Sequence, residues 1–235
     1  MIAPHKLPRI SPSTMLCLAL PVVLFLGYWI DRPFANVMAS KTISLSNLSE
    51  QQKLNIQNAA QAVDGTVVQP GEEFSFNRVV GPRTSPRGYL AAPSYVGREA
   101  PPTMGGGICL LSSALYIDAL HTGLNIVERN PHMRVIHSVP AGFDATVWYG
   151  RYDLRFKNSL DCPLEVTTKY TPDALTVEIK GNTHVPNWQP CGLSWTSRLV
   201  ANGCVTAEVR STQFGKTRVV SRDLYGTPKS GVSHQ

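Results

Sequence analysis

A cysteine follows three consecutive glycines in the segment Gly105-Gly106-Gly107-Ile108-Cys109. Glycine lets the backbone take positive φ angles and approach a ligand closely. The apolar run 110–121, which ends at Gly123, predicts a helix whose first turn carries the cysteine. In that position the unpaired N–H groups and the positive end of the helix dipole lower the pKa of a thiol. This arrangement is typical of a thiolate nucleophile with backbone donors for an oxyanion, and the alternative is a buried structural cysteine in a packed helix.

Helices early in the chain and strands later in the chain would position this thiol. Ser46 or Ser49 can cap a helix that runs to Asp64-Gly65. Alternating or β-branched runs predict strands at 67–68, 134–139, 145–149, 154–157, 164–170, 175–180, 204–209 and 217–220. Thr171–Ala174 and Phe214-Gly215 predict hairpin turns. We therefore expect an α+β fold in which an N-terminal helix and the cysteine-bearing helix pack on a mainly antiparallel sheet.

The N-terminal segment has the pattern of a secretory signal. Lys6 and Arg9 precede the apolar run 15–30, and Val37-Met38-Ala39 resembles a small-residue cleavage site. The apolar run is about 16 residues, shorter than the roughly 20 of a spanning helix, so we expect cleavage near Ser40, with an uncleaved membrane anchor as the alternative. Either way we expect the remainder of the chain to be exported. The predicted domains are a signal or anchor (1–39), a central domain (40–181) and a β-rich C-terminal extension with a loose tail (182–235).

Composition narrows the function classes. Of the 235 residues 43% are hydrophobic and 16% are charged, as in a globular protein. The formal net charge of +6 suits an acidic polymer such as a cell wall, and no basic run with interleaved aromatics indicates nucleic-acid binding. After export, Cys109, Cys162, Cys191 and Cys204 would lie where disulfides form. Cys191 and Cys204 flank a strand-like stretch and are our preferred pair, although one pair with two free thiols and the other pairings remain open.

Several motifs in a fixed order carry a resemblance to a known family. They are Pro70–Asn77, Gly81-Pro82-Arg83-Thr84, Gly105–Cys109, Val127-Glu128-Arg129, Gly142–Val147 and Asp153–Asn158. Over about residues 50–181 the chain resembles VanW-family proteins, which are associated with the bacterial envelope and take their name from a member of vancomycin-resistance gene clusters. Some members are linked to L,D-transpeptidation of peptidoglycan, so the resemblance implies Cys109 as the nucleophile. The sequence departs from the family's usual residues at Leu110, Asn130 and Met133.

Four further residues could act with Cys109. His132 holds a motif position and can titrate near neutral pH, which suits a general base, and the alternative is a histidine satisfied by backbone hydrogen bonds. Asp144 could orient that imidazole as the third group of a triad, or it could cap a turn. Arg83 and Arg129 could hold a stem-peptide carboxylate bidentately, or they could form ion pairs within the protein.

A metal site has little support in the sequence. Cys109, His132 and His137 could together bind zinc, but no short pair of ligands is present. We read His137 as a bystander and expect neither a metal nor another cofactor.

Two function classes follow. In the first, Cys109 attacks an amide of a stem peptide bound at Gly105, Gly106 and Gly107, N–H groups near Gly107–Cys109 hold the oxyanion, and His132 protonates the leaving amine. A second amine then resolves the thioester into a cross-link. In the second, the protein is a non-catalytic envelope module whose glycine-rich loop binds peptidoglycan or another peptide. In both cases the partner is a peptidoglycan stem peptide, and membrane contact is expected only through residues 15–30 if they stay attached.

Overall fold

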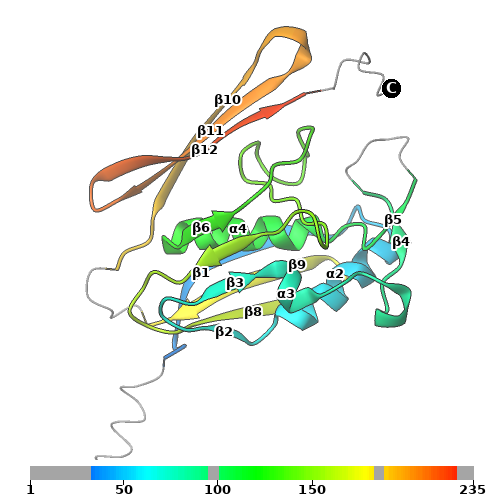
Figure 1. Ribbon diagram of the computed structural model, residues 1–235, viewed down its shortest axis with the longest axis horizontal. Helices are drawn as coiled ribbons and strands as arrows, with labels where there is room; N and C mark the ends of the chain where they lie inside the picture. Colours follow the sequence, from blue (N-terminus) through cyan, green and yellow to red (C-terminus); the bar gives the residue numbers. More distant parts are fainter. Residues whose placement is uncertain (1–32, 95–100, 183–187, 227–235) are drawn as a thin grey trace, which may run out of the picture. The chain divides into compact units, whose positions relative to one another are not determined.

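A four-stranded antiparallel sheet forms the base of the domain. The computed structural model describes residues 33–94, 101–182 and 188–226, and the folded unit begins at Phe34 (Figure 1). The strands lie in the order β1 (Asn36–Ser44), β9 (Ala174–Gly181), β8 (Leu164–Tyr170) and β2 (Thr66–Val68). Alternate residues of these strands are buried, so one face of the sheet contributes to the core.

Two helices pack on this sheet. The helix α2 (Glu50–Val63) begins at Ser49, whose side chain forms a capping box with Gln52. The helix α4 (Cys109–Thr122) ends at Gly123, which has a φ of 83°. α4 contacts β1 and β9, α2 contacts β8, and the two helices contact each other. Residues 110–120 of α4 are buried on every side, so the core fixes the position of Cys109 at its first turn.

Smaller elements surround α4. A three-stranded sheet contains β3 (Glu73–Ser75), β7 (Arg155–Lys157) and β6 (Asn125–Glu128), and the rings of Phe74 and Phe156 stack within it at 4.6 Å. The short helix α3 (Phe76–Val80) follows β3. The helical turn η1 (Ser85–Arg87) and the strands β4 (Ala91–Ala92) and β5 (Thr103–Met104) complete this part.

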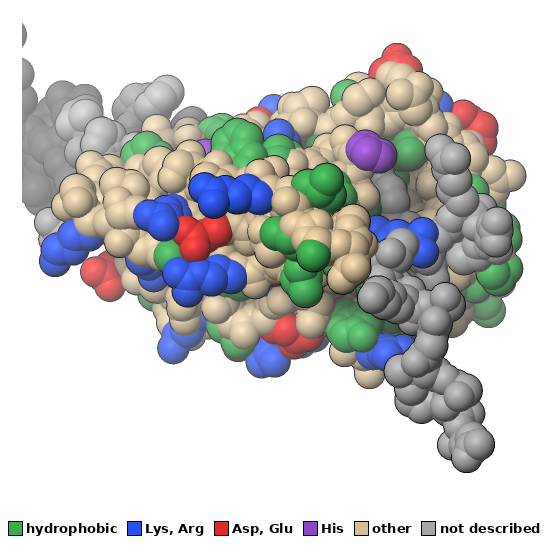
Figure 2. Space-filling model, turned by 90° about the horizontal axis from the view of Figure 1, so that it is seen from above, with side chains coloured by type: hydrophobic (Ala, Val, Ile, Leu, Met, Phe, Trp, Pro, Cys, Tyr) green, Lys and Arg blue, Asp and Glu red, His purple; other side chains and the backbone are tan. Residues whose placement is uncertain are grey.

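The C-terminal extension is a separate three-stranded antiparallel sheet. It contains β10 (Gly192–Leu199), η2 (Ala201–Gly203), β11 (Val205–Gln213) and β12 (Lys216–Tyr225). Val209 and Tyr225 on its inner face are buried, and Trp195 meets Phe143 edge to face at 5.4 Å. Figure 2 looks down on this part of the molecule and shows basic side chains around an acidic one; Arg210 and Arg222 both pair with Glu208.

The α+β prediction is confirmed, but two predicted strands are wrong. The segments 134–139 and 145–149 are loops, apart from the isolated bridges of Thr146 with Asn130 and of Trp148 with Tyr152. Side chains of α4 take the place of a strand partner. Ser113 accepts from the Ala145 N–H at 2.9 Å, and Ser112 donates to the Ala145 carbonyl at 2.6 Å.

The expected signal lies mostly outside the described residues, and only its end can be placed. The motif Val37-Met38-Ala39 lies inside β1, where Met38 and Ala39 are buried and Ala39 pairs with Ile179. The central domain therefore begins at Phe34, six residues before the boundary predicted from the sequence. No helix in the described part of the chain is both long and apolar enough to span a bilayer.

The preferred disulfide is wrong. All four cysteines of the described residues are free. β10 pairs with β11 from Gly192 opposite Thr212 to Leu199 opposite Val205, so Cys191 and Cys204 lie at opposite ends of this hairpin. At about 3.4 Å per residue they are more than about 20 Å apart, whereas a disulfide needs Cα atoms within about 7 Å.

Candidate functional site

The three glycines place the start of α4 against a neighbouring strand. Gly105 and Gly107 have φ angles of +76° and +99°, which side chains rarely adopt. A Cβ atom on Gly106 would lie 2.2 Å from the carbonyl oxygen of Ala92. Only glycine therefore allows this loop to approach β4 and to lead directly into Cys109.

A residue that sequence reasoning missed holds this loop from the side. Asn55 of α2 is fully buried, and its amide donates to the carbonyls of Leu90 at 2.9 Å and of Gly106 at 3.1 Å. Its carbonyl oxygen accepts from the Leu90 N–H at 2.8 Å. The one available signal was a polar side chain within the apolar pattern of a helix, next to Ile56.

Cys109 lies at the first position of α4 with its side chain half-buried. Its sulfur is 3.8 Å from the carbonyl oxygen of Val147. Among the described residues, no hydrogen bond uses the backbone N–H of Gly107 or of Cys109. Both residues line the same cavity, so two N–H groups without a partner among the described residues lie in its wall next to the thiol.

His132 and Asp144 form a buried pair that faces this thiol. The Asp144 Oδ2 atom accepts from the His132 backbone N–H at 2.6 Å and from its ring Nδ1 at 2.7 Å. Burial lowers the pKa of His132, but hydrogen bonding with Asp144 and with Cys109 outweighs it and raises the pKa to about 9. The imidazole is therefore protonated at neutral pH and lies beside the Cys109 thiol.

Asp144 stays ionised because three neighbouring groups stabilise its negative charge. Burial raises the pKa of this carboxyl, but the hydrogen bond from His132, the charge of Arg129 and the hydroxyl of Tyr225 together lower it. Arg129 Nη2 lies 3.0 Å and the Tyr225 hydroxyl 2.5 Å from Asp144 Oδ1. The predicted role of Asp144 in orienting the imidazole agrees with this geometry.

The structure gives Arg129 a different place from the predicted one. Its guanidinium is buried, bonded to Asp144 and to Asp223, and lies 5.1 Å from the ring centre of Tyr116. It does not line the cavity, so its expected part in holding a substrate carboxylate is corrected to a structural ion pair.

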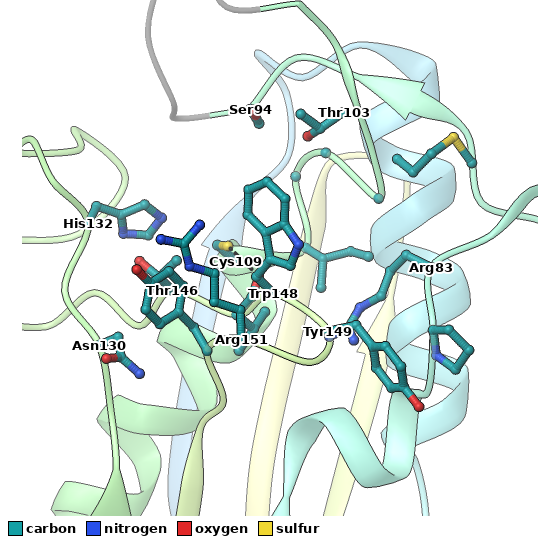
Figure 3. A pocket seen from close by; sticks show the side chains of 18 of the residues that line it. Arg83, Ser94, Thr103, Cys109, Asn130, His132, Thr146, Trp148, Tyr149 and Arg151 are labelled. Atoms are coloured by element: carbon teal, nitrogen blue, oxygen red, sulfur yellow. Dashed lines mark hydrogen bonds between the residues drawn. The ribbon is translucent and has the colours of Figure 1, made fainter. Parts of the chain in front are cut away.

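A cavity of about 780 Å³ opens over Cys109. This volume is in the range of small-molecule and peptide sites. Figure 3 shows His132 pointing toward Cys109, with Arg151 and Trp148 nearby and Arg83 beside Tyr149. The lining comes from Ser94 and four segments: Pro82–Thr84, Thr103–Cys109, Asn130–Met133 and, apart from Gly150, Thr146–Tyr152.

Of the two arginines considered from the sequence, Arg83 is the one that lines the cavity, and Arg151 lines it as well. Its Nη1 atom donates to the Asn77 side chain at 2.7 Å and to the Gly81 carbonyl at 2.8 Å. The guanidinium lies 5.4 Å from the ring centre of Phe76. Its Nη2 atom is buried and has no partner among the described residues, and burial lowers the pKa of the group. A buried donor without a protein partner suits a ligand carboxylate.

The three departures from the family pattern lie close to the thiol. Leu110 is buried in the core, and Met133 is largely exposed at the cavity. The Asn130 side chain donates to Glu128 at 3.3 Å, and the Asn130 backbone carbonyl accepts from the Thr146 N–H. Within the described residues, none of these three side chains hydrogen bonds to the Cys109 sulfur, which lies against the Val147 carbonyl.

His137 does not join the site. It is exposed and does not line the cavity, so Cys109, His132 and His137 do not come together. Within residues 33–94, 101–182 and 188–226, no group of three histidine, cysteine or acidic side chains could hold a metal ion. The chemistry available here is that of a thiol, a protonated imidazole and a carboxylate in series, with two backbone donors beside the thiol.

Comparisons with known proteins point to one family. A model of the family described as VanW like protein matches residues 51–180. An uncharacterized protein of Bacillus subtilis strain 168, YoaR, is 46% identical over 115 residues, which cover 49% of this chain and 38% of that protein. The vancomycin B-type resistance protein VanW of Enterococcus faecalis is 32% identical over 124 residues, which cover 50% of this chain and 44% of that protein. The chain thus spans less than half the length of these curated relatives, and no solved structure matches it.

Proposed function

The chain belongs to the VanW-like protein family, and on that premise we propose that it is an exported cysteine acyltransferase acting on stem peptides of peptidoglycan. The observation that carries this proposal is the series Cys109, His132 and Asp144 at one end of the cavity. A nucleophile, a proton carrier and an orienting carboxylate in that order are the groups that acyl transfer requires.

In the first half-reaction, the Cys109 thiolate attacks the carbonyl carbon of a stem-peptide amide. The oxyanion of the tetrahedral intermediate is held by the backbone N–H groups of Gly107 and Cys109. The intermediate collapses with cleavage of the C–N bond, and the imidazolium of His132 gives its proton to the leaving amine. The products are a thioester on Cys109, a free amine and a neutral His132.

In the second half-reaction, an amine of another stem peptide attacks the thioester carbonyl. His132 takes the proton from that amine, the C–S bond breaks, and the thiolate and imidazolium return. The new amide is a cross-link between the two peptides. Water in place of the amine would give hydrolysis, so exclusion of water from the loaded cavity decides between the two outcomes.

Substrate recognition is assigned to the opposite end of the cavity. The unpaired Nη2 atom of Arg83 can bind a carboxylate of the stem peptide, and the half-exposed rings of Trp148 and Tyr149 offer apolar contact. The position of Arg83 within the cavity lining supports a substrate that carries both an amide and a carboxylate.

Export is part of the same proposal. The basic and apolar pattern of residues 1–30 supports export. Met38 and Ala39 are buried in β1, which favours an uncleaved membrane anchor over signal cleavage before Ser40. The Enterococcus faecalis relative is named for vancomycin B-type resistance, and we extend to this chain a role in the cell envelope under such stress.

The test uses purified wild-type protein and the Cys109→Ser variant, each mixed with muropeptides and analysed by mass spectrometry. We expect cross-linked or shortened products from the wild type and a loss of about a thousandfold or more in rate from the variant. Cys204→Ser, which changes another half-buried cysteine away from the cavity, is the matched control and should retain the activity.

Equal products from wild type and Cys109→Ser would contradict a cysteine mechanism. Binding of sacculi by both proteins, without products from either, would instead support the non-catalytic envelope module. In that case Arg83 and the aromatic residues of the cavity would remain the contacts to test.

A further inference from the structure

The carboxylate of Asp144 receives hydrogen bonds from two parts of the chain. Its Oδ2 atom accepts two bonds from His132, and its Oδ1 atom accepts from Arg129 and from Tyr225. Tyr225 belongs to β12, in the C-terminal sheet, beyond residue 180 where the match to the family ends.

We propose that the C-terminal sheet completes the active site, with Tyr225 and Asp223 as positioning residues that set the orientation and charge of Asp144. This inference rests on the proposed function only for the reaction that the site performs. The contacts themselves are independent of the substrate.

The hydroxyl of Tyr225 has a fixed direction. It accepts from the Gly142 N–H at 2.8 Å, so its single proton is left for Asp144 Oδ1 at 2.5 Å. The Tyr225 side chain is only 1% exposed, and burial followed by the contact with Asp144 raises its pKa, which keeps the phenol neutral. Tyr225 therefore holds one oxygen of Asp144 and leaves the other to His132.

Asp223 acts on the same carboxylate through Arg129. Its Oδ1 atom lies 2.6 Å from Arg129 Nη1, and both side chains are buried. Arg129 thus lies between two carboxylates, and its single positive charge is divided between Asp144 and Asp223. Without Asp223, the full positive charge of Arg129 would act on Asp144 and weaken its hold on the protonated His132.

The sheet also contacts the loop that joins His132 to Asp144. The Gly226 N–H donates to the Met133 carbonyl at 3.0 Å, next to the histidine. At the other end of the loop, a Cβ on Gly142 would lie 2.6 Å from a methyl carbon of Val209, and Phe143 packs against Trp195. Both ends of this loop are therefore held by the same sheet.

The experiment measures the titration of the His132 imidazole by NMR in the full chain, with its signal assigned from the His132→Gln variant. In Asp223→Asn the pKa of His132 should fall from about 9, because a nearby negative charge is lost. In Tyr225→Phe it should rise, because Asp144 loses the hydroxyl that shares its charge. Thr217 lies on β12 away from the site, and its hydroxyl hydrogen bonds to that of Thr212 on β11. Thr217→Val removes this bond and should leave the titration of His132 unchanged.

A second readout follows the reaction. Tyr225→Phe should slow product formation from muropeptides about tenfold while the chain stays folded by circular dichroism. Should the wild type give no product, the proposed function fails, and the His132 titration still decides this inference. If the pKa of His132 is the same in wild type, Tyr225→Phe and Asp223→Asn, the C-terminal sheet packs on the site without acting on Asp144, and the inference is overturned. Tyr225→Phe keeps the ring and is the deciding variant if Asp223→Asn does not fold.

Discussion

Asp144 holds His132 at two points, because one carboxylate oxygen accepts both the backbone N–H and the ring Nδ1–H of the histidine. Two bonds to one oxygen fix the position of the backbone and the rotation of the ring together. The ring side opposite Asp144 then faces Cys109. This geometry makes the histidine a member of the site even without a substrate.

The stability of the fold should fall as the pH rises from about 6.5 to about 9. The pKa of His132 is raised from 6.5 to about 9, so its stabilising contribution is complete below about 6.5 and lost as the pH passes 9. Thermal unfolding followed at about pH 6 and about pH 9.5 measures this loss, which should be smaller in His132→Gln.

A second group must be controlled in that experiment. Burial raises the pKa of Asp118 from 3.8 to about 8, so its contribution also disappears as the pH rises through 8. The comparison is therefore made in an Asp118→Asn background. A pH dependence that is identical with and without His132 in that background would contradict the histidine assignment.

Asn55→Ala should loosen the glycine loop and slow the alkylation of Cys109. The substitution leaves the Leu90 N–H and the Gly106 carbonyl without their partner, and the Leu90 carbonyl keeps only the bond from the Gly105 N–H, at a cost of about 1–3 kcal/mol. Urea unfolding and peptide-resolved alkylation measure the two effects. Asn58→Ala, on the same helix with an exposed hydrogen bond to Gly88, is the control and should change neither by much.

Gly106→Ala should disrupt the site more than an equivalent change elsewhere. The added methyl group would meet the Ala92 backbone at 2.2 Å, so the loop or β4 must move. Gly71→Ala, at a turn with open space around it, should cost only about 1 kcal/mol from its positive φ. Loss of Cys109 alkylation in Gly106→Ala but not in Gly71→Ala is the expected result, and equal rates would refute the close approach.

Arg83→Gln should weaken substrate binding more than the chemical step. Losing a charge-assisted bond to a carboxylate corresponds to an increase of about ten- to a hundredfold in KM. A substrate with that carboxylate amidated should bind wild type and Arg83→Gln equally well. Arg87→Gln, which removes a nearby arginine bonded to the Val80 carbonyl, serves as the control.

A chain that begins at Ser40 should be less stable than one that begins at Phe34. The shorter chain loses the β1 pairs of Asn36, Val37 and Ala39 with β9, together with the burial of Met38. Burying one such side chain is worth about 1.5–3 kcal/mol. Urea unfolding of the two chains measures the difference, and equal midpoints would restore residue 39 as a workable domain boundary.

Local signals in the sequence predicted the two long helices and two of the hairpin turns. Of the two serines considered as caps of α2, Ser49 is the one that caps it, and Gly123 ends α4 where predicted. The turn at Phe214-Gly215 joins β11 to β12 with positive φ at both residues. In each case the deciding contacts lie within a few residues of one another, so the sequence pattern contains them.

Contacts between distant residues were beyond the reach of such patterns. The strand predicted at 145–149 fails because Ser112 and Ser113 of α4 bind the backbone of Ala145. The sequence left Arg129 either a substrate carboxylate or an ion pair, and the choice depends on Asp223, in a sheet more than 90 residues later. The strand β1 lies in a segment whose residues matched a cleavage motif, and only its pairing with β9 reveals it.

The hydrogen bond between Tyr225 and Asp144 can form only late in the synthesis of the chain. Cys109 leaves the ribosome 116 residues before Tyr225, which at about 5–20 residues per second is a delay of roughly 6–23 s. During that interval the thiol is already synthesised, but the full set of bonds to Asp144 does not yet exist. A growing polypeptide therefore carries the Cys109 thiol for several seconds before the hydrogen bond from Tyr225 to Asp144 can form.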